Sequence, residues 1–155
     1  MTITTTTHLN FRGTARQALE FYQDVFGGQI TAATYGDVGM PADAPGADRI
    51  VFGRLDSESG LRLMAYDIPG EDAADSAGTA GETRRENGLT FTDRTFFQSL
   101  QGETLDEVAA YWEGLSAGAE IVEPLAASPW SPGFGMLTDR FGVTWVVDVR
   151  SPDAG

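Results

Sequence analysis

Imidazole is the side chain most often used for acid–base chemistry near neutral pH, and this sequence has one, His8. The chain contains no cysteine, which excludes disulfides, thiolate metal sites and thiol nucleophiles. A Ser-His-Asp arrangement would have to use His8, and we expect no nucleophile elbow to accompany it. We therefore expect His8 to form hydrogen bonds in a binding site rather than to act as the general base that activates a nucleophile.

The charge of the chain excludes several kinds of partner. The formal net charge is −13, and the 10 basic residues are all arginines scattered along the sequence. Nucleic acids and anionic lipids require a clustered basic face, so we expect neither as a partner. The N-terminus has no secretory pattern and no apolar run approaches a membrane span, which predicts a cytoplasmic protein.

Two amphipathic helices are predicted at a separation of ninety residues. Apolar residues recur at helical spacing within Thr14–Phe26 and within Thr104–Ser116. Thr14 stands three residues before Gln17, and Thr104 stands three residues before Glu107. Each pair predicts a capping box at the start of its helix. Gly27-Gly28 supplies a left-handed end to the first helix. The repeated pattern indicates duplication of one unit.

Each predicted helix follows one short apolar strand and precedes three more, so each half is predicted to have the order β-α-β-β-β. The predicted division is a single domain over 1–155, with a first module at 8–69, a linker loop at 70–94 and a second module at 95–150. The linker lacks periodicity. Two roles stay open for it, connection alone or cover over part of a binding site. The predicted strands are His8–Gly13, Gln29–Tyr35, Arg49–Asp56, Arg62–Asp67, Phe96–Gly102, Glu120–Leu125, Gly135–Thr138 and Val143–Val149.

A set of local motifs resembles the vicinal-oxygen-chelate superfamily, the glyoxalase/bleomycin resistance/extradiol dioxygenase group, and most of all its PhnB-like branch. The most specific motif is the turn Asp139-Arg140-Phe141-Gly142 before a strand that bears Trp145. The resemblance implies an α+β fold of two tandem βαβββ modules, with curved mixed sheets around a central cavity. It does not imply one chemistry. The other matching segments are Gly13-Thr14-Ala15, Ala18 to Tyr22, Phe26-Gly27-Gly28, Leu63 to Asp67, Tyr111 to Leu115, Pro124-Leu125, Ser128-Pro129-Trp130 and Phe134 to Thr138.

Enzymes of this family usually hold a divalent metal through His, Gln and Glu side chains on the first and last strands of each module. Strand alternation places His8, Asn10 and Arg12 toward the cavity, and His8 falls near the family's first ligand position. Thr95 and Val146 stand at two other ligand positions, where neither is a good ligand. Asp148 shares the face of Val146, and Gln98 would reach the site only if its strand slipped by one residue. We therefore predict no metal and no other cofactor.

The remaining cavity is predicted to be apolar with a few polar groups. Trp112 and Trp145 are predicted to fill the space between helix and sheet, whereas Trp130 is predicted to wall the binding site. The predicted ligand-contacting residues are His8, Asn10, Phe97, Trp130, Phe134, Thr144 and Asp148.

The sequence thus predicts a protein that binds a small organic molecule in a central pocket, without a firmly held metal. The alternative is a divalent-metal-dependent lyase, isomerase or dioxygenase of the same superfamily. Exposed edge strands favour a homodimer.

Overall fold

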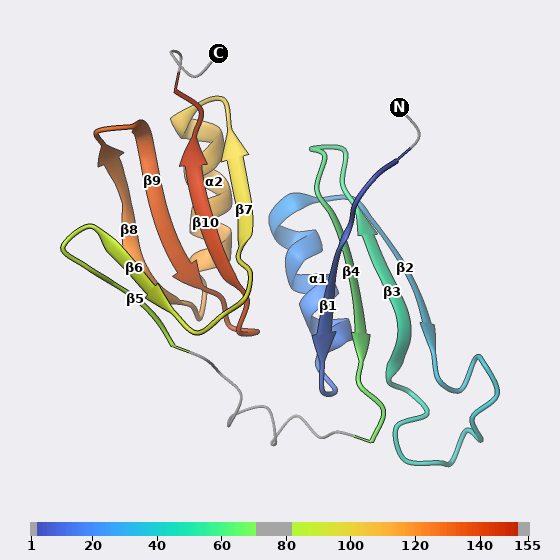
Figure 1. Cartoon of the computed structure of the whole chain (residues 1–155). Coiled ribbons are helices and arrows are strands. Elements are labelled where there is room, and N and C mark those ends of the chain that lie inside the picture. Colours follow the sequence, from blue (N-terminus) through green and yellow to red (C-terminus); the bar gives the residue numbers. More distant parts are fainter. Residues whose placement is uncertain (1–2, 71–81, 152–155) are drawn as a thin grey trace. The chain divides into compact units, whose positions relative to one another are not determined.

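The computed structural model describes residues 3–70 and 82–151, which fall into two compact units, Met1–Thr79 and Ala80–Gly155. In the described residues each unit has one helix and one four-stranded sheet, and the second unit also has a two-stranded hairpin (Figure 1). The elements of the first unit are β1 (Thr7–Phe11), α1 (Ala15–Phe26), β2 (Gln29–Thr34), β3 (Ile50–Asp56) and β4 (Arg62–Asp67). Those of the second are β5 (Thr83–Glu86), β6 (Leu89–Thr92), β7 (Gln98–Gly102), α2 (Leu105–Ser116), β8 (Glu120–Ser128), β9 (Ser131–Thr138) and β10 (Thr144–Val149).

The two four-stranded sheets have the same topology. The strand order is β1-β4-β3-β2 in the first unit and β7-β10-β9-β8 in the second. In each sheet the strand before the helix pairs parallel with the last strand, and the other neighbours are antiparallel. The predicted α+β fold of two β-α-β-β-β modules with mixed sheets is confirmed.

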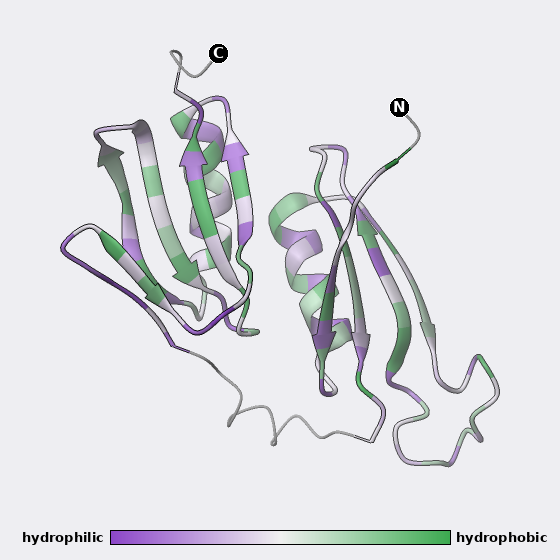
Figure 2. Ribbon diagram, viewed as in Figure 1, coloured by the Kyte–Doolittle hydropathy of each residue, from purple (hydrophilic) through white to green (hydrophobic). Residues whose placement is uncertain are grey.

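In the first unit, α1 covers one face of the sheet. Buried and less buried residues alternate along β4, where Leu63, Ala65 and Asp67 are buried. Gly53 lies on the same face, and a Cβ atom there would lie 2.6 Å from Leu19 Cδ1 of α1, so only glycine lets the helix approach. Figure 2 shows hydrophobic and hydrophilic residues mixed along the strands, so hydropathy alone does not distinguish the two faces. In each unit the helix covers one face of the sheet. We call the opposite face of that sheet its open face.

In the second unit, α2 covers the sheet in the same way. Trp145 is fully buried on β10, and the ring of Trp112 lies so close to Gly135 that a Cβ atom there would be 2.8 Å from it. The predicted position of both tryptophans between helix and sheet is thus confirmed. The arrangement leaves Val146 and Asp148 on the open face.

The helix starts differ from the predicted pair of capping boxes. The Thr104 side chain accepts a hydrogen bond from Glu107 N, at 3.2 Å, as predicted for α2. Thr14 makes no side-chain cap. The Asp67 carboxylate instead accepts the hydrogen bond from Ala15 N, at 3.0 Å. A buried carboxylate from β4 therefore replaces the local cap of α1.

The segment predicted as a linker loop contains a β-hairpin. Strands β5 and β6 pair across Asn87-Gly88, where both residues have positive φ, 53° and 78°. An Asn-Gly pair between short strands is a strong hairpin signal, and the lack of periodicity in the surrounding sequence obscured it. Phe96 also differs from its predicted place in a strand, because β7 begins at Gln98 and Phe96 is 59% exposed.

None of the helices in the described residues is both long and apolar enough to span a membrane.

Candidate functional site

One row of side chains crosses the open face of the first unit on all four strands. The strand register places His8 opposite Met64, Met64 opposite Arg54, and Arg54 opposite Thr31. An imidazole, a thioether, a guanidinium and a hydroxyl therefore follow one another across the sheet. The predicted direction of His8 and Asn10 agrees with this placement, because both alternate with the buried Leu9 and Phe11.

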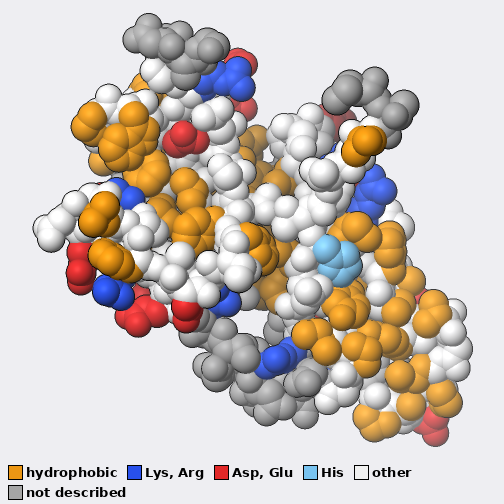
Figure 3. Space-filling view, in the orientation of Figure 1, with side chains coloured by type: hydrophobic (Ala, Val, Ile, Leu, Met, Phe, Trp, Pro, Cys, Tyr) orange, Lys and Arg blue, Asp and Glu red, His pale blue; other side chains and the backbone are white. Residues whose placement is uncertain are grey.

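The His8 ring is held by two neighbours. Its Nδ1 atom lies 2.9 Å from Asn10 Oδ1. The ring also meets the edge of Tyr66, with 5.3 Å between centroids and 69° between planes. Asn10 stands opposite Tyr66 in the register, so the three side chains form one cluster on β1 and β4. Figure 3 shows the chain's single imidazole, in pale blue, at the surface with hydrophobic side chains next to it.

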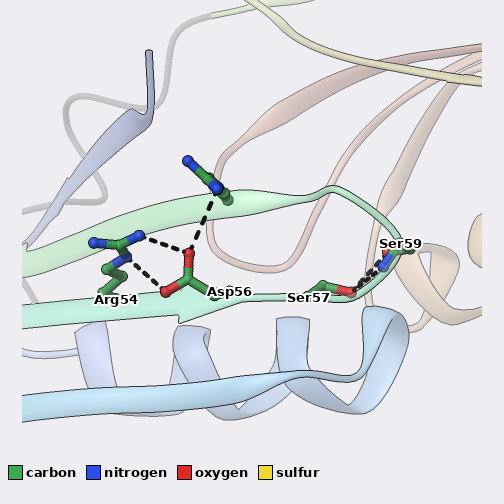
Figure 4. A network of polar contacts seen from close by, with 5 residues as sticks. Arg54, Asp56, Ser57 and Ser59 are labelled. Carbon is green, nitrogen blue, oxygen red and sulfur yellow. Dashed lines mark hydrogen bonds and ion pairs between the residues drawn. The ribbon is translucent and has the colours of Figure 1, made fainter. Parts of the chain in front are cut away.

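Arg54 belongs to a charged network at the next strand of the same face (Figure 4). Its Nε lies 2.6 Å from Asp56 Oδ2, and its Nη2 donates to Asp56 Oδ1 at 2.9 Å. Arg62 Nε lies 3.8 Å from the same carboxylate. Two guanidinium groups thus share one carboxylate, and the network carries one excess positive charge in a chain of net charge −13.

Beneath this face, Asp67 fixes the backbone. Its carboxylate accepts hydrogen bonds from Gly13 N and Ala15 N through Oδ1, at 2.8 and 3.0 Å, and from Ile50 N through Oδ2, at 2.9 Å. The Tyr35 hydroxyl donates to the Asp67 carbonyl at 2.6 Å. Burial, followed by the nearby Tyr66 and Asp67, raises the pKa of Tyr35 above its ordinary value. Tyr35 therefore stays a neutral donor, and this cluster is structural.

The open face of the second unit combines polar and aromatic groups. Gln101 stands opposite Asp148 in the register, and its Nε2 donates to Asp148 Oδ2 at 3.3 Å. Asp148 is also opposite Phe134 on β9. The Phe134 ring meets Trp130 edge to face, with centroids 5.3 Å apart. The predicted residues Trp130, Phe134 and Asp148 thus belong to one connected surface.

The β5–β6 hairpin covers part of this face. The Arg85 guanidinium lies 5.0 Å from the centroid of Phe134, and Arg85 Nε lies 3.5 Å from Glu123 Oε2. The Thr90 hydroxyl contacts the sulfur of Met136 at 3.7 Å, and Met136 is 1% exposed although it lies on the open face. Of the predicted linker, the described β5–β6 hairpin therefore lies on the sheet of its own unit.

Two of the predicted ligand-contacting residues, Thr144 and Phe97, are less accessible to a ligand than His8 and Asn10. Thr144 is buried, and its hydroxyl shares a 2.8 Å hydrogen bond with that of Thr138, so its polar group is already used within the sheet. Phe97 is half-buried and lies just before β7. His8 and Asn10 belong to the first unit and the other five predicted residues to the second. Gln101 was missed, because its pairing with Asp148 depends on the strand register.

The residues present do not fit the metal that the fold family implies. Within residues 3–70 and 82–151, no group of three or more His, Asp or Glu side chains gathers where it could hold an ion. Val146 stands opposite Ser99 on the open face, and Thr95 precedes β7 altogether. His8 stands opposite Met64. A single imidazole with a thioether is a poor donor set for a hard divalent ion.

A sequence match to Gly-x-Ser-x-Gly at Gly114 to Gly118 is not a nucleophile elbow. Such an elbow requires a sharp turn from a strand into a helix. Ser116 instead ends α2, and its hydroxyl donates to Trp112 O at 2.6 Å. This serine therefore serves the helix end.

Comparison with known proteins agrees with the fold. The model of the glyoxalase/bleomycin resistance protein/dioxygenase superfamily matches residues 7–147. Protein YjdN of Escherichia coli (strain K12) is 24% identical over 144 residues, 92% of each chain. The crystal structure of protein PA1353 from Pseudomonas aeruginosa is 29% identical, with a TM-score of 0.72 over 96% of this chain and 98% of that one. A PhnB protein from Bacillus cereus, described as a putative 3-demethylubiquinone-9 3-methyltransferase, is 23% identical, with a TM-score of 0.66 over 95% of this chain and 99% of that one.

Proposed function

Since the chain belongs to the glyoxalase/bleomycin resistance protein/dioxygenase superfamily, we propose that it binds a small organic molecule on the open faces of its sheets, without a firmly held metal. The observation that carries this proposal is the row of His8, Met64, Arg54 and Thr31 across the open face of the first unit, which we call the His8 row. His8, which the sequence resemblance puts near the family's first ligand position, is paired with Met64 and hydrogen-bonded to Asn10. An imidazole in this setting is equipped to bind an organic group rather than to complete a metal site.

The first unit supplies the mixture of groups that small-molecule sites use. Such sites combine apolar and aromatic walls with a few oriented polar groups. Here Met64 and Tyr66 supply apolar surface, His8 and Asn10 supply an oriented polar pair, and Arg54 supplies charge. These residues are half-buried or exposed on one sheet face. They are therefore available to a ligand, in contrast to the buried groups beneath them.

The open face of the second unit supports the same function, but fewer of its side chains are accessible to a ligand. Trp130 is 54% exposed and contacts Phe134, which offers an aromatic surface next to Asp148. The β5–β6 hairpin already covers part of this face, where Arg85 contacts Phe134 of β9 and Glu123 of β8. We therefore assign the larger share of ligand recognition to the first unit.

Metal titration tests the metal-free part of this proposal against the metal-dependent alternative. Chelator-treated protein would be titrated with Zn²⁺, Ni²⁺ and Mn²⁺ in a calorimeter, beside the variants His8→Ala and Glu20→Gln. Glu20 is an exposed carboxylate on α1 and controls for weak binding to the acidic surface. We expect the three proteins to give the same weak heats. Binding near one ion per chain that His8→Ala abolishes and Glu20→Gln preserves would favour the lyase, isomerase or dioxygenase.

A further inference from the structure

We propose that Asn10 holds His8 as the Nδ1–H tautomer, so that His8 Nε2 accepts a hydrogen bond from the ligand, and that this ligand is an organic acid whose anion lies at Arg54. The inference rests on the proposed function and names the chemical class of the molecule bound on the first unit.

The tautomer follows from the contact between His8 and Asn10. The Asn10 Oδ1 atom has lone pairs and no proton, so the His8 Nδ1 atom 2.9 Å away must be the donor. A neutral imidazole with its proton on Nδ1 has a lone pair on Nε2. Contact with the Tyr66 ring limits rotation of the imidazole. Nε2 is therefore a fixed acceptor, which suits a ligand that bears an O–H or N–H group.

The anion end follows from the charge of the neighbouring network. Arg54 and Arg62 lie 2.6 and 3.8 Å from one carboxylate, that of Asp56, which leaves one positive charge in excess. The side chains of all three are close to half exposed, so a ligand carboxylate can reach them. Salt screens exposed charges that are more than about 8 Å apart, so acidic residues beyond that distance weaken this local excess little. Guanidinium groups pair well with carboxylates.

The register sets the spacing between the two ends. His8, Met64 and Arg54 stand in one row on β1, β4 and β3. Two strand spacings separate His8 from Arg54 by about 10 Å. Met64 lies between them and offers an apolar floor. The row therefore fits a flat or elongated molecule with a carboxylate at one end and a hydrogen-bond donor at the other.

The first test reads the tautomer directly. The single histidine gives one pair of imidazole signals in a long-range ¹H–¹⁵N spectrum, which distinguishes the protonated nitrogen from the bare one. We expect the Nδ1–H form of the ring. Asn10→Asp keeps the acceptor oxygen and should keep this tautomer, whereas Asn10→Ala should release it. An Nε2–H form in the unsubstituted protein, or no change in Asn10→Ala, would overturn the assignment.

The second test determines the ligand class by measuring the affinity for 4-hydroxycinnamate, which has a carboxylate and a phenolic donor at opposite ends. The control compounds are its methyl ester, which lacks the charge, and cinnamate, which lacks the donor. Loss of one ionic or hydrogen-bonding contact typically weakens binding about tenfold, so we expect that loss for each control. Arg54→Gln should remove the preference for acid over ester, and Asn10→Ala should reduce the preference for 4-hydroxycinnamate over cinnamate. Arg84→Gln, on the hairpin of the second unit, should change neither.

The outcomes separate this inference from the proposed function. Equal binding of acid and ester, or an unchanged preference in Arg54→Gln, would overturn the organic-acid class while small-molecule binding stands. Absence of binding by all three compounds at millimolar concentration would overturn the ligand class as well. Failure of the proposed function itself would appear as stoichiometric metal binding through His8.

Discussion

At the scale of single residues, Asp67 connects three parts of the first unit. It lies on β4, and its two carboxylate oxygens accept backbone hydrogen bonds from the start of α1 and from the start of β3. The Asp67 side chain is 1% exposed, and the Ala15 and Ile50 donors are buried, so no other acceptor replaces the carboxylate if it is removed. Asp67 therefore helps to place β1, β3 and β4, three of the four strands that carry the His8 row.

Replacing Asp67 should cost much of the stability of the protein. Asp67→Ala leaves two buried N–H donors, of Ala15 and Ile50, and the part-buried N–H of Gly13 without their acceptor, and we expect the free energy of unfolding to fall by about 3 kcal/mol or more. Asp148→Asn is the control, because Asp148 is half-buried and makes one 3.3 Å contact with Gln101. Its effect should stay within about 0.5 kcal/mol. Urea denaturation followed by tryptophan fluorescence measures both, and equal effects would contradict this role of Asp67.

Strand alternation was sufficient to predict the direction of His8, Asn10, Val146 and Asp148, because residues two apart share a face. Alternation does not give the register between strands, and a slip of one residue would reverse every face. The pairing of Gln101 with Asp148 and the use of the Thr144 hydroxyl by Thr138 both depend on that register. For this reason the site prediction omitted Gln101, and it included Thr144 although the Thr144 hydroxyl is already hydrogen-bonded within the sheet.

At the scale of elements, the two helices begin by different means. The Thr104 hydroxyl caps α2, whereas α1 receives its cap from Asp67. The capping pattern in the sequence is the same for both helices. A distant carboxylate that takes over a cap cannot be recognised from local sequence, because the contact joins residues 52 positions apart.

This difference predicts unequal effects of one substitution at two matched positions. Thr104→Ala removes a side-chain cap, and we expect the free energy of unfolding to fall by about 1 kcal/mol. Thr14→Ala removes no cap hydrogen bond and should change that free energy by less than about 0.5 kcal/mol. Thermal or urea unfolding of the two variants provides the measurement. A larger loss in Thr14→Ala than in Thr104→Ala would show that the cap assignments are wrong.

The β5–β6 hairpin depends on Arg85 for its position on the sheet. The Arg85 side chain is 11% exposed and contacts Phe134 and Glu123, while its Nη1 donates to Thr90 Oγ1 at 2.7 Å. A two-stranded hairpin is marginal by itself, so these contacts must contribute to its stability. The turn at Asn87-Gly88 could be predicted from the sequence, but the docking of the hairpin could not, since it rests on side chains more than thirty residues away.

Substitution of Arg85 should therefore loosen the hairpin. In Arg85→Gln we expect the amides of Thr83–Thr92 to exchange with solvent faster, by about tenfold if one charged contact is lost. Arg84→Gln is the matched control, because Arg84 is half-exposed and contacts groups of the hairpin itself, Phe91 and Glu86. Hydrogen–deuterium exchange measures both variants. Equal exchange in the two would mean that Arg85 does not hold the hairpin.

At the scale of the whole molecule, the duplicated units explain why the fold was predictable. The same order of one strand, one helix and three strands occurs twice, and each unit reproduces the same sheet topology. The periodic helices and the Asp139 turn are strong local signals, so they identified the architecture. Ligand recognition was less predictable, because it depends on cross-strand contacts that only the folded sheets create.

We propose that the protein is a homodimer. Each four-stranded sheet ends in two edge strands, and unpaired edges of this kind favour association with a second copy. Light scattering at micromolar concentration should give twice the 16.6 kDa mass of the chain. A mass of one chain under those conditions would refute the dimer.

We propose that the open face around His8 holds an organic molecule and not a metal ion. Native mass spectrometry of the protein taken directly from the cells that make it tests this claim, with His8→Ala measured in parallel. We predict an adduct of organic composition that is weakened in His8→Ala, with no divalent ion bound in proportion to the chain. A mass increase of one transition-metal ion per chain that disappears in His8→Ala would contradict the claim.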